Sequence, residues 1–109
     1  MSFNNYARRV KNVDLPMGPR VRALRSCIGM LASLRNESFN QEIKRFDERF
    51  HFNWTRGIFS KKPSEGALIA TLMAVEAERN AYLEDLRAEA LKRKAAKTRR
   101  RMPHSHQDM

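Results

Sequence analysis

The segment from residue 64 to residue 95 constrains the fold more than any other part of the sequence, because apolar residues recur along it at helical spacing. They advance by four and three positions, with one arginine among them, at Leu68, Leu72, Val75, Arg79, Tyr82 and Leu86. A second line repeats every seven residues, at Ala67, Ala74, Ala81, Ala88 and Ala95. A sustained seven-residue repeat is typical of a long helix that packs along another helix.

The sequence also indicates where this long helix begins. Ser64 follows Pro63 and is suited to cap the helix, and Glu65 puts a negative charge in the first turn. No apolar member of the seam lies beyond Leu91. A helix of about 30 residues spans roughly 45 Å, which shorter helices cannot cover completely. We therefore expect its second half to project into solvent, to fray or to pair with a partner, and a homodimer through this helix is one prediction.

Two shorter amphipathic helices are predicted before it, over residues 20–35 and 38–50. The first has apolar residues at Val21, Leu24, Ile28 and Leu31, and the second at Phe39, Ile43, Phe46 and Phe50. Pro19 fits the first position of the first helix, and Ser38 fits the N-cap of the second. Both stripes recur at three and four positions, as on one face of a helix. We expect the phenylalanines of the second stripe to form a core rather than a stacking platform.

The two ends of the chain differ from this helical centre. Residues 1–18 carry basic side chains and are predicted to form a flexible basic arm with one helical turn near Tyr6–Val13, broken by Pro16, Gly18 and Pro19. Residues 92–109 are predicted to be a disordered basic tail in which Pro103 ends any helix. The predicted fold class is therefore all-α, with two short helices packed on one long C-terminal helix within a helical domain at 19–91.

The charges are unevenly distributed along the chain. Lys and Arg number 22 against 12 Asp and Glu, giving a net charge of +10. Residues 64–91 have two basic and six acidic side chains, whereas residues 92–109 have seven basic and one acidic. Cations gathered in this way favour contact with a polyanion, although an acidic helix body could also neutralise basic helices of the same chain.

The segment 51–63 is the most suggestive for binding, because aromatic and basic residues alternate in it. Phe52, Trp54 and Phe59 are interleaved with Arg56, Lys61 and Lys62. Aromatic rings can stack on exposed bases while cations hold phosphates. The same residue types are enriched at protein–protein hot spots. A third interpretation is that Trp54 only covers the end of a small core.

The candidate nucleic-acid-binding residues follow from these patterns. The arginines early in the helix at 20–35 lie near its N-terminus, where the helix dipole makes positive charge slightly unfavourable. Their presence indicates a reason other than helix stability, such as a bound anion. The alternative is that they only form a solvated face. The full set is Arg20, Arg22, Arg25, Trp54, Arg56, Lys61, Lys62, Lys92, Arg93, Lys94, Lys97, Arg99, Arg100 and Arg101.

Other chemistry is not indicated. The four glycines form no phosphate-binding loop, and Cys27 lies on an apolar stripe with no histidine paired to it. The single cysteine and three histidines do not show metal-ligand spacing. We therefore expect no enzyme activity, cofactor or metal. With no secretory signal and no long apolar run, we expect a cytoplasmic protein without membrane contact.

Three functions remain open on the sequence. The leading prediction is a small nucleic-acid-binding or nucleic-acid-associated regulator that contacts mainly the phosphate backbone of DNA or RNA. A helix-turn-helix is not favoured, because the link from Arg35 to Glu37 lacks the expected glycine. The alternative is a modulator or adaptor that docks on a larger host protein through the aromatic-basic loop and the long helix. A ribosome-associated structural protein is the third.

Overall fold

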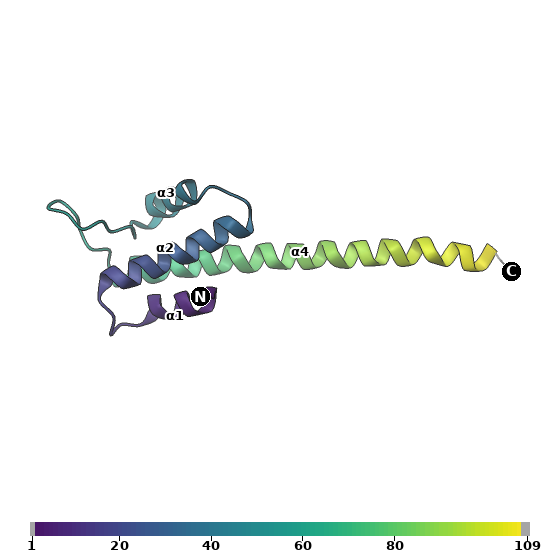
Figure 1. Ribbon diagram of the computed structural model, residues 1–109, viewed down its shortest axis with the longest axis horizontal. Coiled ribbons are helices and arrows are strands. Elements are labelled where there is room, and N and C mark those ends of the chain that lie inside the picture. Colours follow the sequence, from purple (N-terminus) through teal and green to yellow (C-terminus); the bar gives the residue numbers. More distant parts are fainter. Residues whose placement is uncertain (1, 108–109) are drawn as a thin grey trace. The chain divides into compact units, whose positions relative to one another are not determined.

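The computed structural model describes the backbone of residues 2–107 and the side chains of residues 2–97. Its four helices are α1 (Phe3–Lys11), α2 (Met17–Leu34), α3 (Phe39–Phe50) and α4 (Glu65–Gln107), shown in Figure 1. Residues 2–107 contain no strand, so the predicted all-α class with a long C-terminal helix is confirmed.

The chain divides into two compact units, one ending at Glu78 and the other beginning at Arg79. The first unit contains α1, α2, α3 and the beginning of α4, and α2 packs against both α1 and α3. Its buried core draws on all four helices and on the loop after α3: the largest fully buried side chains are those of Phe46, Phe52, Leu24, Ile28, Leu31, Leu68, Leu72 and Val10. Most of the three apolar stripes predicted from the sequence therefore meet in one core, but Phe39, predicted to be a core residue, is 39% exposed.

Helix α1 lies within the segment that the sequence had indicated as a basic arm with a single turn. Ser2 caps the helix, and its Oγ accepts a hydrogen bond from the backbone N–H of Asn5. Phe3, Ala7 and Val10, at spacings of four and three, are buried against the core. The segment is ordered because this short stripe covers α2, while its polar face carries the basic residues.

The turn between α2 and α3 is made at Asn36, which directly follows the C-cap of α2. Asn36 has a φ of 55°, in the left-handed region, which asparagine tolerates better than most residues. The N–H groups of Asn36 and Glu37 donate to the carbonyls of Ser33 and Ala32, the pattern that closes a helix C-terminus. Ser38 then caps α3 by accepting from the N–H of Gln41.

The beginning of α4 agrees with the sequence. The Oγ of Ser64 accepts a hydrogen bond from the N–H of Ala67 at 2.9 Å, as an N-cap does. The helix, however, continues past Leu91 and past Pro103 to Gln107. Alanine, lysine and arginine predominate from residue 92 to residue 101, and their high helix propensity outweighs the lack of apolar residues there. The prediction that Pro103 ends the helix is wrong, and helix propensity does not explain this.

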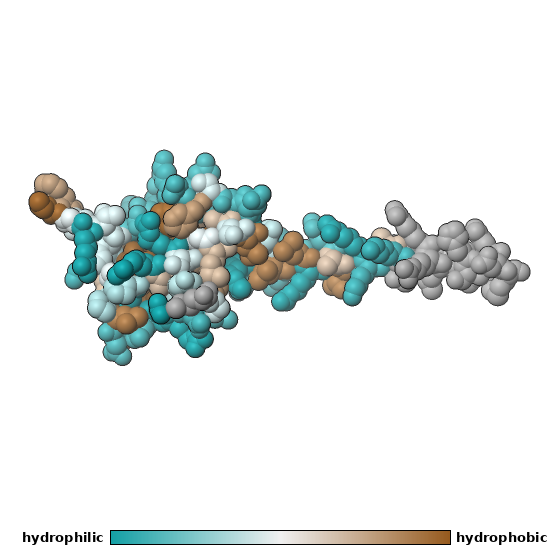
Figure 2. Space-filling model, in the orientation of Figure 1, coloured by the Kyte–Doolittle hydropathy of each residue, from teal (hydrophilic) through white to brown (hydrophobic). Residues whose placement is uncertain are grey.

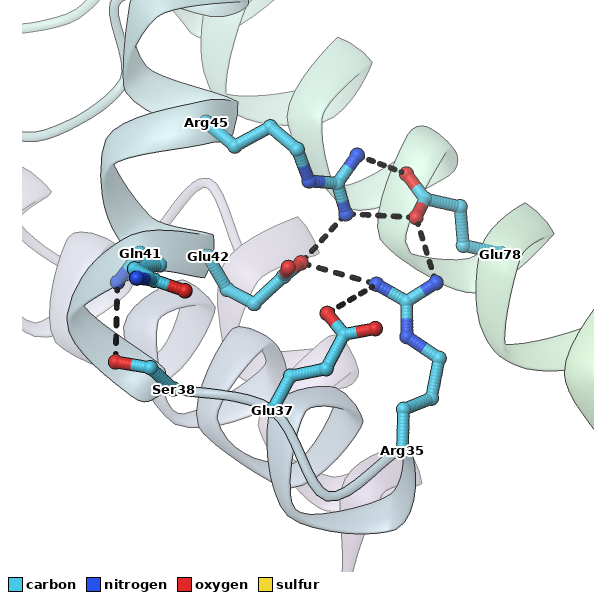
Figure 3. Close-up of polar contacts among 7 residues, drawn as sticks. All are labelled: Arg35, Glu37, Ser38, Gln41, Glu42, Arg45 and Glu78. Atoms are coloured by element: carbon cyan, nitrogen blue, oxygen red, sulfur yellow. Dashed lines mark hydrogen bonds and ion pairs between the residues drawn. The ribbon is translucent and has the colours of Figure 1, made fainter.

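A network of ion pairs joins α2, α3 and α4 within the first unit (Figure 3). Arg35, at the C-cap of α2, donates to Glu42 of α3 at 3.0 Å and to Glu78 of α4 at 3.1 Å. Arg45 of α3 donates to both carboxylate oxygens of Glu78, at 2.7 and 3.1 Å. Glu42 is 5% exposed, so it needs these partners to remain charged.

The pKa values of the carboxyl groups reflect this network. Burial alone would raise the pKa of Glu78, but hydrogen bonds and charges from Arg45 and Arg35 outweigh burial and lower it. The pKa of Glu42 is lowered for the same reason, chiefly by Arg45 once the opposing effect of burial is overcome. Glu37 accepts from Arg35 but lies beside Glu42, and its pKa is raised mainly through the hydrogen bond with Glu42.

The second unit is the part of α4 that begins at Arg79. Tyr82 and Leu83 are half-buried, and every side chain from residue 84 to residue 97 is exposed. Leu86 is 42% and Leu91 is 68% exposed. The predicted apolar seam is therefore buried at Leu68, Leu72 and Val75 but not at Leu86.

Candidate nucleic-acid interface

An open pocket of about 430 Å³ lies between the first turns of α2 and the loop that follows α3. Its lining residues are Gly18, Val21, Arg22, Arg25, Trp54, Thr55 and Arg56. Three of the seven are arginines and none is acidic, so the walls combine positive charge with an indole ring. This is the composition that the sequence had suggested for residues 51–63, now joined by two arginines from α2.

The arginines of this pocket differ in how firmly their side chains are held. Arg25 is half-buried, and its Nη1 donates to Oδ1 of Asn53 at 2.6 Å. Its guanidinium also lies 5.8 Å from the ring centre of Phe39. Arg22 and Arg56, by contrast, are exposed. Arg25 is thus held in place by neutral partners, which leaves its positive charge uncompensated, while Arg22 and Arg56 can reach a ligand.

Two cations of the loop, Arg56 and Lys62, lie close to the ring of Trp54. Its side chain is half-buried and packs against the core. The guanidinium carbon of Arg56 lies 5.7 Å and Nζ of Lys62 lies 5.6 Å from the centre of its ring. Cation–π attraction of this kind holds a positive group near an aromatic face without neutralising it. Trp54 therefore covers the end of the core, as one interpretation of the sequence held, and also positions two cations.

A second, smaller pocket adjoins the first through a shared arginine. It measures about 350 Å³ and is lined by Tyr6, Arg9, Pro19, Arg22, Ala23 and Ser26. Arg22 lines both pockets. Positive side chains thus continue from the loop, across α2, to Arg9 on α1. Arg9 was not among the predicted contacts, because residues 1–18 were predicted to form a flexible arm. The spacing of Phe3, Ala7 and Val10 is the signal that places Arg9 on a packed helix.

Arg20 does not belong to this surface. It is 3% exposed, and its Nε donates to the carbonyl of Val10 at 2.8 Å. Nη1 and Nη2 each donate to one carboxylate oxygen of Glu65 at 2.6 Å. The hydrogen bond with Glu65 raises the pKa of Arg20, and the same bond lowers the pKa of Glu65. Arg20 fastens α1 and α4 to α2, and its prediction as a phosphate contact is corrected accordingly.

The remaining loop cations lie on a mixed surface. Lys61 and Lys62 line a third pocket, of about 520 Å³, together with Asp47, Phe50, His51, Asn53, Pro63, Ser64 and Ala67. The carboxylate of Asp47 accepts a hydrogen bond from the N–H of Asn53, which makes it part of the loop's own structure. Lys61 is exposed, and Lys62 faces Trp54, so both remain candidates.

The candidates in the second unit are exposed as far as they are described. Lys92, Arg93, Lys94 and Lys97 are exposed on α4, and Arg93 lies 3.9 Å from Glu89. Arg99, Arg100 and Arg101 lie outside the residues whose side chains are described. The structure therefore offers two separate groups of cations: one built around α2 and the loop, and one along the end of α4.

Comparisons with known proteins add no relative. No family model, no curated protein and no solved structure matches this chain. Within the described part of the chain, no group of three or more His, Cys, Asp and Glu side chains is placed to hold a metal ion. No helix in that part is both long enough and apolar enough to cross a lipid bilayer.

Proposed function

We propose that this protein binds nucleic acid, mainly through its phosphate backbone, with the pocket around Trp54 as the central contact. The observation that carries the proposal is the lining of this pocket: Arg22, Arg25 and Arg56 surround an indole, with no carboxylate among the lining residues. Guanidinium groups match phosphate oxygens in charge and geometry, and each phosphate neutralised releases counterions.

Three further features support the same function. The pocket includes Gly18 in the first turn of α2, where the helix dipole adds partial positive charge. Arg22 connects it to the pocket that contains Arg9, so the cations can follow more than one phosphate along a strand. The exposed cations of α4 add nonspecific attraction that accelerates encounter with a polyanion.

The test is a titration against labelled duplex DNA, single-stranded DNA and RNA at several salt concentrations. We expect binding that weakens steeply with salt. Replacing Arg22 and Arg56 by glutamine should lower the affinity at every sequence and reduce the slope of log K against log salt by about two, because two phosphate contacts are lost.

The matched control is the double replacement of Lys44 and Arg49 by glutamine. It removes the same charge from exposed positions of α3 that line none of the three pockets described above. If both double variants lose affinity equally, the attraction is general and the pocket has no special part. If the unaltered protein binds none of the three nucleic acids at low salt, the proposed function is wrong.

A protein-binding adaptor is the second candidate, and the solvent-exposed apolar side chains of the loop between α3 and α4 favour it. Ile58 and Phe59 are 95% and 97% exposed. In this case Trp54→Ala would abolish capture of a protein partner with little dependence on salt, and removal of residues 92–109 would have little effect. Under the nucleic-acid proposal, by contrast, the affinity should fall steeply as the salt concentration rises.

A further inference from the structure

The loop between α3 and α4 ends in an apolar tip that contributes nothing to the core. Figure 2 shows a brown patch at the end of this loop, beside teal residues; the exposed apolar residues there are Ile58 and Phe59. A turn closed by the hydrogen bond from the N–H of Ser60 to the carbonyl of Gly57, at 3.1 Å, places them at its two central positions. Such positions ordinarily favour glycine, proline, asparagine, aspartate or serine.

The three rings of this loop differ in what they can still bind. Phe52 is fully buried, and Trp54 is half-buried with Arg56 and Lys62 close to its ring. A base could stack on Trp54 only by displacing these cations or by using area that they leave open. Phe59, at 97% exposure, has almost all of its surface available. Any stacking by this loop therefore falls to Phe59 rather than to Trp54.

We propose that Ile58 and Phe59 insert between adjacent bases of the bound nucleic acid and separate them. Arg56 and Lys62 flank the tip in sequence and are held near Trp54, where they would grip phosphates on either side of the opened step. Apolar wedges of one or two residues, isoleucine and phenylalanine among them, are used in this way to unstack base steps. This inference rests on the proposed nucleic-acid function and adds to it a defined contact with the bases.

The size of the tip favours bases over the other occupants of an exposed apolar site. A specific protein interface takes about 20–30 residues from each side, far more than this turn offers. A stable membrane anchor takes two signals, since even a single acyl chain gives marginal binding, and two side chains at a loop tip bury less than such a chain. A base step, by contrast, is filled by one or two side chains.

The experiment uses the full chain with a duplex DNA and a single-stranded DNA that carry 2-aminopurine, whose fluorescence rises when the base is unstacked. The unaltered protein should raise this fluorescence as it binds. The variant with both Ile58→Ser and Phe59→Ser should bind about tenfold or more weakly, consistent with lost base contacts, and should leave the fluorescence unchanged at saturation. Its salt slope should match that of the unaltered protein, because no cation is removed.

Two single variants sharpen the result. Phe59→Tyr, with Ile58 unchanged, retains a planar ring, so this variant should still raise the fluorescence, unlike the double serine variant. Met73→Ala removes an apolar side chain that is 63% exposed on α4, and it should change neither affinity nor fluorescence. Both exposed tip residues lie outside the core, so circular dichroism spectra of all variants should coincide.

The outcomes separate the inference from the function on which it rests. If the unaltered protein binds with a steep salt slope and the double serine variant behaves identically, the insertion is wrong and the phosphate contacts stand. If the serine variant instead loses binding to phosphatidylserine-containing vesicles while its binding to DNA is unchanged, the tip enters lipid and the inference is overturned. If the unaltered protein binds no nucleic acid at low salt, the proposed function fails, and the inference fails with it.

Discussion

Arg20 and Arg22 show how two identical residues on one helix acquire different roles. Both belong to a basic run that the sequence could interpret only by its charge. Arg20 points toward the core and donates to the carbonyl of Val10 and to Glu65, whereas Arg22 is exposed and lines two pockets. The difference arises from helix phase: Arg20 lies one position before Val21 and four before Leu24, at the edge of the buried stripe. The sequence predicted the stripe, but not that a carbonyl and a carboxylate would meet this edge.

This difference predicts unequal effects on stability. Arg20→Met should lower the free energy of unfolding by about 1–3 kcal/mol, because the buried carbonyl of Val10 loses its donor. Arg22→Met should change it by less than about 0.5 kcal/mol, as expected for an exposed site. Urea unfolding followed by circular dichroism measures both.

Arg20→Lys is the informative companion variant. It keeps the charge but cannot supply the fork that reaches both oxygens of Glu65, so it should be destabilised as well. Equal stability of Arg20→Lys and the unaltered protein would mean that the charge alone matters. Loss of DNA affinity in Arg20→Lys without loss of stability would restore Arg20 to the binding surface.

At the scale of elements, the helices that the sequence predicted best are those whose apolar residues recur every three or four positions over three or more turns. α2, α3 and the beginning of α4 were predicted to within a few residues, including the caps Ser38 and Ser64. α1 was underestimated, because a nine-residue helix shows only three buried positions, Phe3, Ala7 and Val10. The network at Arg35, Glu42 and Glu78 could not be predicted, since it depends on how three helices meet.

Two carboxyl groups of the network, together with Glu65 beside Arg20, predict that stability falls in acid. The pKa values of Glu42, Glu65 and Glu78 are lowered in the folded protein, so the unfolded chain binds protons more readily and stability is lost as pH falls from about 4.5 toward the folded values. Glu37, whose pKa is raised, acts in the opposite direction and partly offsets them. Three carboxyl groups oppose one, so the urea midpoint should be lower at pH 3 than at pH 6.

The variant that tests the cause is Glu78→Gln. At pH 7 it should lower the free energy of unfolding by about 1–3 kcal/mol, because Arg35 and Arg45 lose charged hydrogen bonds. It should also flatten the dependence of the urea midpoint on pH. Glu48→Gln, at an exposed position of α3, is the control and should alter neither. An unchanged pH dependence in Glu78→Gln would show that other carboxylates control acid unfolding.

At the scale of the whole molecule, the described buried side chains and the described exposed cations of the chain's end belong to different segments. The buried residues extend from Phe3 to Val75, whereas every described side chain after Leu83 is exposed. The sequence predicted that the shorter helices would not cover the second half of the long helix, but it put the last apolar residue of the seam at Leu91, whereas the described buried residues end at Val75. The acidic body and basic flanks of the long helix are a property of the sequence itself. Pairing of two chains through the exposed part of α4 stays a prediction that sedimentation would test.

This separation predicts what a protein ending at Leu91 will do. It loses seven basic residues and one acid, which lowers the net charge from +10 to +4. Because the described core ends at Val75, its thermal midpoint should equal that of the full chain within about 2 °C, a shift that corresponds to less than 1 kcal/mol for a chain of this size.

The affinity of the shortened protein for DNA at low salt should be more than tenfold lower than that of the full chain, and its salt slope should be smaller. If the pocket around Trp54 is a real contact, the shortened protein will still bind, and replacing Arg22 and Arg56 by glutamine in it will lower the remaining affinity and reduce its salt slope by about two. Residual binding that ignores these two arginines would place the phosphate contacts elsewhere on the first unit.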